Sequence, residues 1–184
     1  MAATESTMMD LGTTAPDFKL LDVVKGEKVS LGSLKGIEAT VVLFICNHCP
    51  FVKHINKSLV AISNAFIPKG VSFIAISSND VANYPEDSPE KMAEVAKKEG
   101  YAFPYLYDES QDVAKSYGAV CTPDLFVFDK NLKCLYRGQF DLSTPGNGIE
   151  VSGDSLKNAL SAHLEEGEII ENQLPSIGCG IKWK

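Results

Sequence analysis

The sequence predicts an α/β domain in which a mixed central sheet is flanked by helices and preceded by a β-hairpin. Residues 39–46 (ATVVLFIC) and 71–76 (VSFIAI) are apolar runs rich in β-branched residues, typical of strands buried on both faces. Between them, apolar residues recur every three or four positions, which indicates a helix packed on such a sheet. A second helical segment and a hairpin pattern follow, and this alternation is typical of mixed α/β sheets covered by helices.

The N-terminal hairpin is predicted over residues 16–36, where short apolar stretches flank the turn-prone residues 24–27. The helix after the first buried strand follows directly and is ended by Pro68 and Gly70. Its apolar positions are Phe51, Ile55, Leu59, Ile62 and Phe66. This spacing places them on the face that packs on the sheet.

In the second half of the chain, Ser88 is the predicted N-cap of a helix that runs through Lys98, with Pro89 at its first position. Gly100 ends this helix. The later elements follow similar signals: a short strand at 103–107, a short helix at 110–117 ended by Gly118, an antiparallel hairpin at 125–128 and 134–137, and a last helix from its cap Asp154 to about Glu166, stopped by Gly167. Residues 167–184 show no clear period.

The length of 184 residues predicts a single domain over residues 1–184, with its core at about 13–166 and residues 167–184 as a tail. A net charge of −7 argues against nucleic acid or an anionic membrane as partner. The first ten residues contain no basic residue, so we expect neither a signal nor a transit peptide. No feature indicates an oligomer interface, and no organic cofactor or metal is expected.

Five cysteines, an odd number, argue against a disulfide scaffold and for thiols that are kept reduced or cycled, as in the cytoplasm. Cys46-Asn47-His48-Cys49 lies where a buried strand passes into a helix. We expect Cys46 at or just before the helix start, where free backbone N–H groups and the dipole favour a thiolate. Cys49 lies about one turn on, so the pair can switch between dithiol and disulfide.

Zinc binding, haem attachment and inert burial are other uses of a CxxC motif. A protonated His48 favours the thiolate further, and Pro50 is tolerated in the first turn of the helix. Zinc would need further ligands, such as His54, because the chain has no second CxxC. A c-type haem site is excluded, since Pro50 stands where the histidine would be. Two inert buried cysteines remain an alternative.

The motif, the stretch at 15–20 (APDFKL) and the segment at 121–129 (CTPDLFVFD) resemble the redoxin branch of the thioredoxin superfamily. That branch contains the alkyl hydroperoxide reductase/thiol-specific antioxidant proteins and CxxC thiol–disulfide oxidoreductases. The CNHCPFV sequence and the ending at 175–179 resemble a thioredoxin-like subgroup. The resemblance implies a thioredoxin-like fold with Pro123 as a cis-proline beside the CxxC. It also implies that the Thr122 backbone holds an extended substrate.

The two activities of this branch make different demands. A peroxiredoxin uses a Pro-x-x-x-Thr-x-x-Cys motif and a later arginine. With Cys49-Pro50 aligned to the end of that motif, Cys46 stands at the threonine position, Val42 at the proline position and Pro123 at the arginine position. Of the four residues of a peroxiredoxin site, the proline, the threonine and the arginine are therefore missing. The residues that a dithiol activity needs are present, namely a CxxC at a strand-to-helix junction and a proline before the later strand. One departure is Thr40, which stands where thioredoxins place a buried acid.

We therefore predict a thiol–disulfide oxidoreductase that acts on a protein or small-molecule disulfide and is recycled by an upstream thiol reductant. In this mechanism Cys46 attacks and Cys49 resolves the mixed disulfide. A peroxiredoxin-like, antioxidant peroxidase with Cys49 as the peroxidatic thiol is the alternative. A third hypothesis is a binding module that holds zinc or copper(I) through Cys46, Cys49 and Cys121.

The remaining thiols carry their own expectations. Cys121 is predicted beside the CxxC, as a third redox thiol or a loop filler. Cys179, in the tail, is either a distal resolving thiol or simply free, and Cys134 is structural. Arg137 is expected to form a surface salt bridge.

Overall fold

The computed structural model describes residues 3–184 and contains one large sheet and one small sheet. The large sheet has the strand order β3-β2-β6-β5-β4-β8-β9. In chain order its strands are β2 (Lys19–Asp22), β3 (Glu27–Ser30), β4 (Ala39–Phe44), β5 (Val71–Ser77), β6 (Tyr105–Tyr107), β8 (Asp124–Asp129) and β9 (Cys134–Gly138). Strands β4, β5 and β6 are mutually parallel, β8 runs antiparallel to β4, and the edge strand β9 runs antiparallel to β8. The predicted mixed sheet and its N-terminal hairpin are confirmed.

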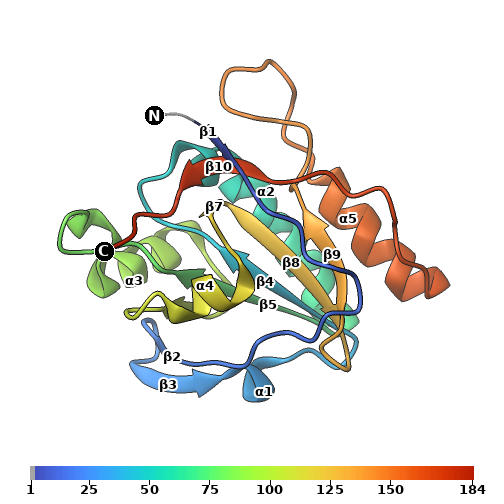
Figure 1. Cartoon of the computed structure of the whole chain (residues 1–184), viewed down its shortest axis with the longest axis horizontal. Helices are drawn as coiled ribbons and strands as arrows, with labels where there is room; N and C mark the ends of the chain where they lie inside the picture. The colour runs from blue at the N-terminus through green and yellow to red at the C-terminus, as the bar shows by residue number, and fades with distance from the viewer. Residues whose placement is uncertain (1–2) are drawn as a thin grey trace.

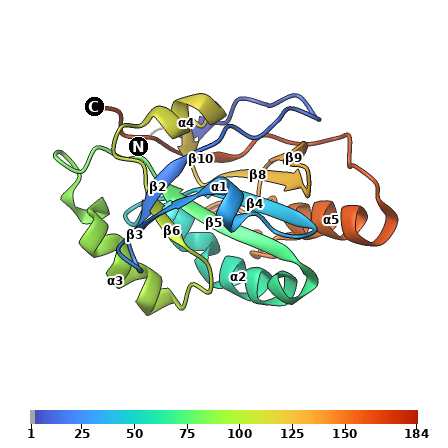
Figure 2. The ribbon, with the colours of Figure 1, turned by 90° about the horizontal axis from the view of Figure 1, so that it is seen from below.

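Helices cover both faces of this sheet (Figures 1 and 2). They are α1 (Leu31–Leu34), α2 (Pro50–Phe66), α3 (Pro89–Glu99), α4 (Asp112–Tyr117) and α5 (Asp154–Ser161), with short 3₁₀ turns at Ile67–Lys69 and Pro85–Asp87 and a π-helical turn at Ala162–Glu166. Helices α2, α3 and α5 bury their apolar residues against one face, and α4 packs on the other. Among the described residues, no helix has the length and apolar character needed to cross a bilayer.

The alternation of side chains along β4 explains the two cores. Val41 and Leu43 belong to the cluster under α2, whereas Val42 and Phe44 face the cluster that contains Tyr117 of α4. Because successive side chains of a strand point to opposite faces, a strand buried on both sides must be apolar throughout. The residues of β4 are all buried, as the sequence indicates.

Most predicted helix and strand boundaries agree with the structure; of two predicted helix N-caps, one is confirmed and one is wrong. Ser88 caps α3 and accepts from the Lys91 backbone N–H, as predicted. The predicted cap at Asp154 is wrong, because Gly153 is the N-cap of α5 and Asp154 is its first residue. Gly153 has φ +68°, and a Cβ there would overlap Ile62 and lie 2.9 Å from the Phe140 ring. Glycine is therefore required at this close approach.

The small sheet was not predicted. It consists of β1 (Ala3–Glu5), β10 (Ile177–Gly180) and β7 (Cys121–Thr122), in the order β1-β10-β7. Figure 1 shows β10 crossing the top of the molecule between β1 and β7. Cys179 and Gly180 of the tail are thereby paired with the segment that leads into Pro123.

Candidate active site: a buried dithiol beside a cis-proline

The CxxC motif lies in the connection between β4 and α2, at the carboxyl end of a central strand. Cys49 is the N-cap of α2, and Pro50 is its first residue. Cys46, expected at or just before the helix start, lies before the helix, in the loop between β4 and the N-cap. Proline at the first helical position fits here because its missing N–H has no partner in a helix.

The segment before β8 faces the two cysteines. The Thr122–Pro123 peptide bond is cis, as the resemblance implied. The Cys49 Sγ lies 3.1 Å from the Thr122 carbonyl oxygen, and the Cys46 Sγ lies 3.5 Å from the Thr122 hydroxyl. Both sulfurs are almost completely buried, with 2% of Cys46 and none of Cys49 exposed. The structure thus brings Cys46, Cys49, Thr122 and Pro123 together.

A buried carboxylate holds the loop between the cysteines. Asp87 is fully buried and accepts hydrogen bonds from the backbone N–H groups of Asn47 (2.8 Å) and His48 (3.3 Å). It also contacts the His48 Nδ1 at 2.6 Å and accepts from the Asn79 side chain at 2.8 Å. Several hydrogen-bond donors stabilise the buried Asp87 carboxylate, and these bonds fix the CxxC loop against Asp87.

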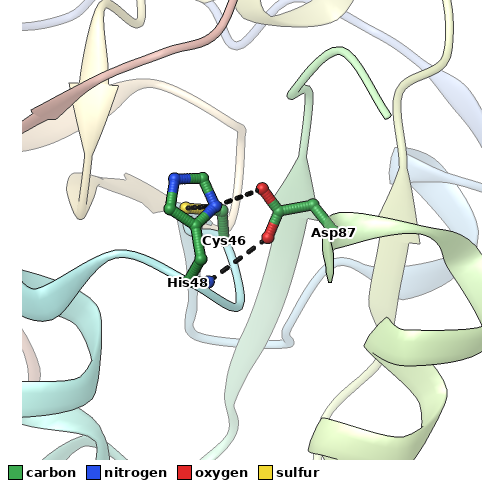
Figure 3. Close-up of side chains that lie close together, drawn as sticks. All are labelled: Cys46, His48 and Asp87. Atoms are coloured by element: carbon green, nitrogen blue, oxygen red, sulfur yellow. Dashed lines mark hydrogen bonds and ion pairs between the residues drawn. The ribbon is translucent and has the colours of Figure 1, made fainter. Parts of the chain in front are cut away.

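His48 connects this carboxylate to the dithiol. Its Nδ1 lies 3.9 Å from the Cys46 Sγ as well as 2.6 Å from Asp87, and Figure 3 shows the ring reaching both groups. The ring stacks on Tyr84, with 5.5 Å between centroids and 10° between planes. Because Nδ1 faces a carboxylate, that nitrogen carries the hydrogen in the neutral ring. His48 therefore presents a polar N–H beside the Cys46 sulfur.

Asn47 fixes the same loop from its side chain. The amide donates to the Glu86 carbonyl at 2.9 Å and accepts from the Tyr105 hydroxyl at 3.2 Å. Tyr105 is in β6, and Glu86 lies in the turn before α3. Asn47 thus connects the CxxC loop to two separate elements, β6 and the 3₁₀ turn at Pro85–Asp87.

The Cys46 and Cys49 side chains share a single ionisable proton when one of them is a thiolate. Hydrogen bonding from Cys46 is the main cause that lowers the pKa of Cys49 to about 5, and the same interaction, with burial, raises the pKa of Cys46. The contact from Cys49 to the Thr122 carbonyl, however, requires a hydrogen on Cys49, and when it is made the charge lies on Cys46. We therefore assign one thiolate to the pair, with the remaining hydrogen on either sulfur.

Titration of the reduced protein is expected to show one thiolate per molecule between about pH 4 and pH 7, read from absorbance at 240 nm. The other three thiols stay protonated there, because burial raises the pKa values of Cys121, of Cys134 (to about 11) and of Cys179 (to about 11). Cys46→Ala should move the Cys49 transition upward, towards an ordinary thiol, while Cys134→Ala leaves it in place. A wild-type thiolate that forms only above about pH 8 would contradict this assignment.

The other predicted residues lie as follows. Cys121 is buried in β7 and its thiol contacts the Pro123 carbonyl at 3.7 Å. Cys134 is buried in β9, in the core on the α4 side. Cys179 is in β10, opposite Thr122, and belongs to the same core cluster as Cys46 and Cys49. The His54 Nε2 lies 3.1 Å from the Ser143 hydroxyl.

The metal hypotheses can be compared with these positions. Within residues 3–184, one group of three potential ligand side chains lies close together, formed by Cys46, His48 and Asp87. It includes neither His54 nor Cys121, so both predicted ligand sets differ from it. In this group the His48 Nδ1 is already engaged with Asp87.

Asp87, Asn79 and the strand in the tail were not predicted from the sequence, and Arg137 was misplaced. The predicted surface salt bridge of Arg137 is wrong: its guanidinium is buried and pairs with Asp124, with 2.9 Å between Nη2 and Oδ2. The polar loop at 141–153 contributes Asp141 to Thr144 and Asn147 to a cavity of about 270 Å³ that also touches Pro123 and Phe51.

Comparisons with known proteins agree with this geometry. The curated thiol-disulfide oxidoreductase ResA of Geobacillus kaustophilus is 29% identical over 128 residues, covering 70% of this chain and 68% of that protein. An uncharacterized conserved protein from Geobacillus kaustophilus has a crystal structure that matches with a TM-score of 0.98 and 58% identity, covering 100% of this chain and 97% of that chain.

The fold itself is found in the thioredoxin domain of a thiol-disulfide oxidoreductase from Bacteroides vulgatus, with a TM-score of 0.63, 21% identity, and coverage of 82% of this chain and 98% of that chain. The predicted thioredoxin-like fold is confirmed. The model of the AhpC/TSA family matches residues 11–137, which include the CxxC motif and the cis-proline. The chain belongs to the AhpC/TSA family.

Proposed function

We propose that this protein is a thiol–disulfide oxidoreductase that reduces disulfides through Cys46 and Cys49. The observation that carries the proposal is the pair of sulfurs at the β4–α2 junction, both in contact with Thr122 of the cis peptide bond. The name of the curated relative, a thiol-disulfide oxidoreductase, supports the same activity. A shared thiolate supplies the nucleophile that the reaction needs at neutral pH.

In the first step the Cys46 thiolate attacks one sulfur of the substrate disulfide. A mixed disulfide forms, and the other substrate sulfur leaves as a thiolate. Cys46 is assigned this step because it is the slightly more exposed sulfur and lies beside the Thr122 hydroxyl and the His48 Nδ1. The Thr122 hydroxyl stabilises negative charge on the attacking sulfur, whereas the nearby Asp87 carboxylate opposes it.

In the second step Cys49, after losing its proton, attacks Cys46 and displaces the second substrate sulfur. The substrate leaves as a dithiol, and the enzyme is left with a Cys46–Cys49 disulfide. An upstream thiol reductant must restore the dithiol, because the cycle otherwise ends after one turnover. Protein disulfides are the proposed substrates, and the odd number of cysteines supports a reducing, cytoplasmic setting.

Peroxidase activity is disfavoured by the positions that the peroxiredoxin motif would occupy. Val42, at the position of the motif's proline, is fully buried within β4, and Pro123 stands where peroxiredoxins place an arginine. The buried Arg137 is engaged with Asp124 instead of with a cysteine. An antioxidant role through peroxide turnover therefore has little support from these residues.

Two rates measured on the fully reduced protein test the proposal: reduction of insulin by a dithiol reductant, and consumption of hydrogen peroxide. We expect clear acceleration of insulin reduction and negligible consumption of peroxide. Cys134→Ala should behave as wild type in both assays, since Cys134 lies in the opposite core. Rapid peroxide consumption without insulin reduction would overturn the proposal in favour of a peroxidase.

A further inference from the structure

The chain's own C-terminal strand lies along the edge that precedes the cis-proline. Strand β10 pairs antiparallel with β7, so that Cys179 is opposite Thr122 and Gly180 is opposite Cys121. This is the backbone that the family resemblance assigns to an extended substrate. In Figure 1 the strand fills the space between β1 and β7. The edge beside the dithiol is therefore occupied from within the molecule.

Gly178 fits this strand tightly against the cis peptide bond. A Cβ added there would overlap the Thr122 carbonyl oxygen and lie 2.6 Å from the Thr122 carbonyl carbon. No other residue can approach this peptide so closely without displacing the strand. The position of β10 is therefore sensitive to a single added methyl group.

Hydrogen bonds hold β10 at both ends. The Ser176 hydroxyl donates to the Gly138 carbonyl at 2.8 Å, before the strand. After it, the Lys182 N–H donates to the Asn79 side chain at 2.9 Å, and Asn79 in turn donates to Asp87. The tail is thus connected to the same carboxylate that holds the CxxC loop.

This arrangement places a third thiol against the redox pair. Cys179 is 4% exposed and belongs to the same core as Cys46 and Cys49. Helix α2, whose N-cap is Cys49, is in contact with β10. Cys179 is paired with Thr122 in the β10–β7 register, and the Cys49 Sγ lies 3.1 Å from the Thr122 carbonyl oxygen, so both cysteines adjoin the same peptide. Cys49 thus has one cysteine neighbour in its own loop and another in the tail.

We propose that Cys179 is the third thiol of the redox centre and exchanges with the Cys46–Cys49 disulfide inside the molecule. The Cys179 thiolate attacks the Cys49 sulfur, the Cys49–Cys179 bond forms, and the Cys46–Cys49 bond breaks. Cys46 leaves as a thiolate, and the proton given up by Cys179 returns to it or to solvent. The oxidation state of the protein does not change, so no additional oxidant or reductant is needed.

The inference rests on the proposed function, which generates the Cys46–Cys49 disulfide. Its consequence is an oxidised enzyme with two disulfide isomers. One isomer leaves Cys46 free while the disulfide is held between α2 and the tail. The oxidised protein can therefore present a free thiol at the position that meets substrate.

Disulfide mapping tests the exchange. Wild-type protein and Cys46→Ser, at about 10 µM, are oxidised with diamide, alkylated, digested and analysed by mass spectrometry. We expect both isomers in wild type and an intramolecular Cys49–Cys179 link in Cys46→Ser, favoured over dimers by about 100-fold because adjacent groups have effective concentrations of at least the millimolar range. Wild type with the Cys46–Cys49 link alone, or Cys46→Ser with dimers alone, would overturn the proposal.

Two matched variants show whether the link depends on the seating of β10. In the Cys46→Ser background, adding Gly178→Ala should lower the yield of the Cys49–Cys179 link several-fold, whereas adding Cys134→Ala should leave it unchanged. Equal yields in both would contradict the role of β10. Insulin reduction by wild type is measured in parallel. If wild type forms the Cys49–Cys179 link but does not reduce insulin, the proposed function is overturned. If wild type reduces insulin but the link does not form, only this inference is overturned.

Discussion

Replacing either Cys46 or Cys49 with serine is expected to bring protein-disulfide reduction down to the uncatalysed rate, a loss on the order of 10³-fold or more. Each step of the exchange uses one of the two sulfurs as nucleophile, and a serine hydroxyl in the same place cannot form or resolve a mixed disulfide. Both side chains are buried, and serine is close to cysteine in size, so the fold should persist. Insulin reduction, with circular dichroism to verify folding, provides the measurement.

The two variants differ in the covalent species that accumulates. Cys49→Ser retains the attacking thiol but lacks the resolving one, so it should trap a substrate on Cys46 that intact-mass analysis detects. Cys46→Ser should trap far less. The control is Cys134→Ala, which retains both steps. Equal trapping by the two serine variants would reverse the assignment of Cys46 as the nucleophile.

The dithiol and the cis-proline were predictable because each depends on a short sequence signal. Cys46 and Cys49 are separated by two residues, and the apolar period of α2 locates the junction at which they lie. The exact start of the helix was not predictable, because proline is tolerated throughout the first turn, so Pro50 fits a helix that begins at Cys46 as well as one that begins at Pro50. The cis state of Pro123 came from the family resemblance, since few X–Pro bonds are cis.

Asp87 was not predictable from its local sequence. It reaches the CxxC loop because β4 and β5 are parallel neighbours, so that the loops after both strands lie at the same edge of the sheet. Thr40, which stands where thioredoxins place a buried acid, is buried and accepts from the Gly36 N–H. The buried carboxylate near the dithiol therefore comes from a different loop, and only the tertiary arrangement reveals it.

The tail was missed for a similar reason. Strand β10 is four residues long and contains two glycines, so it has no apolar alternation to mark it. Its partners β1 and β7 have only three and two residues. Pairing between such short strands depends on where the rest of the fold places them. The one local signal was the Gly178-Cys179-Gly180 sequence, in which small residues flank a thiol.

Replacing Arg137 with methionine is expected to lower the free energy of unfolding by about 3–5 kcal/mol, because it leaves the buried Asp124 without its charged partner. The two side chains are at most 1% exposed. The guanidinium also donates to the carbonyls of Tyr117 and Gly118 and lies 4.0 Å above the Phe126 ring. It therefore holds together the segment that leads into Pro123. Denaturant unfolding at pH 8 measures the loss.

The dependence of this loss on pH separates a charge effect from a packing effect. Burial raises the pKa of Asp124 to about 7, and Arg137 opposes that rise, so removing Arg137 raises it further. At pH 5 the carboxyl of the variant is then protonated and leaves no buried charge, so the deficit should shrink there relative to pH 8. Lys157→Met, which breaks the exposed pair with Asp154, is the matched control and should change little at either pH. An equal deficit at both pH values would assign the destabilisation to lost packing of the Arg137 side chain.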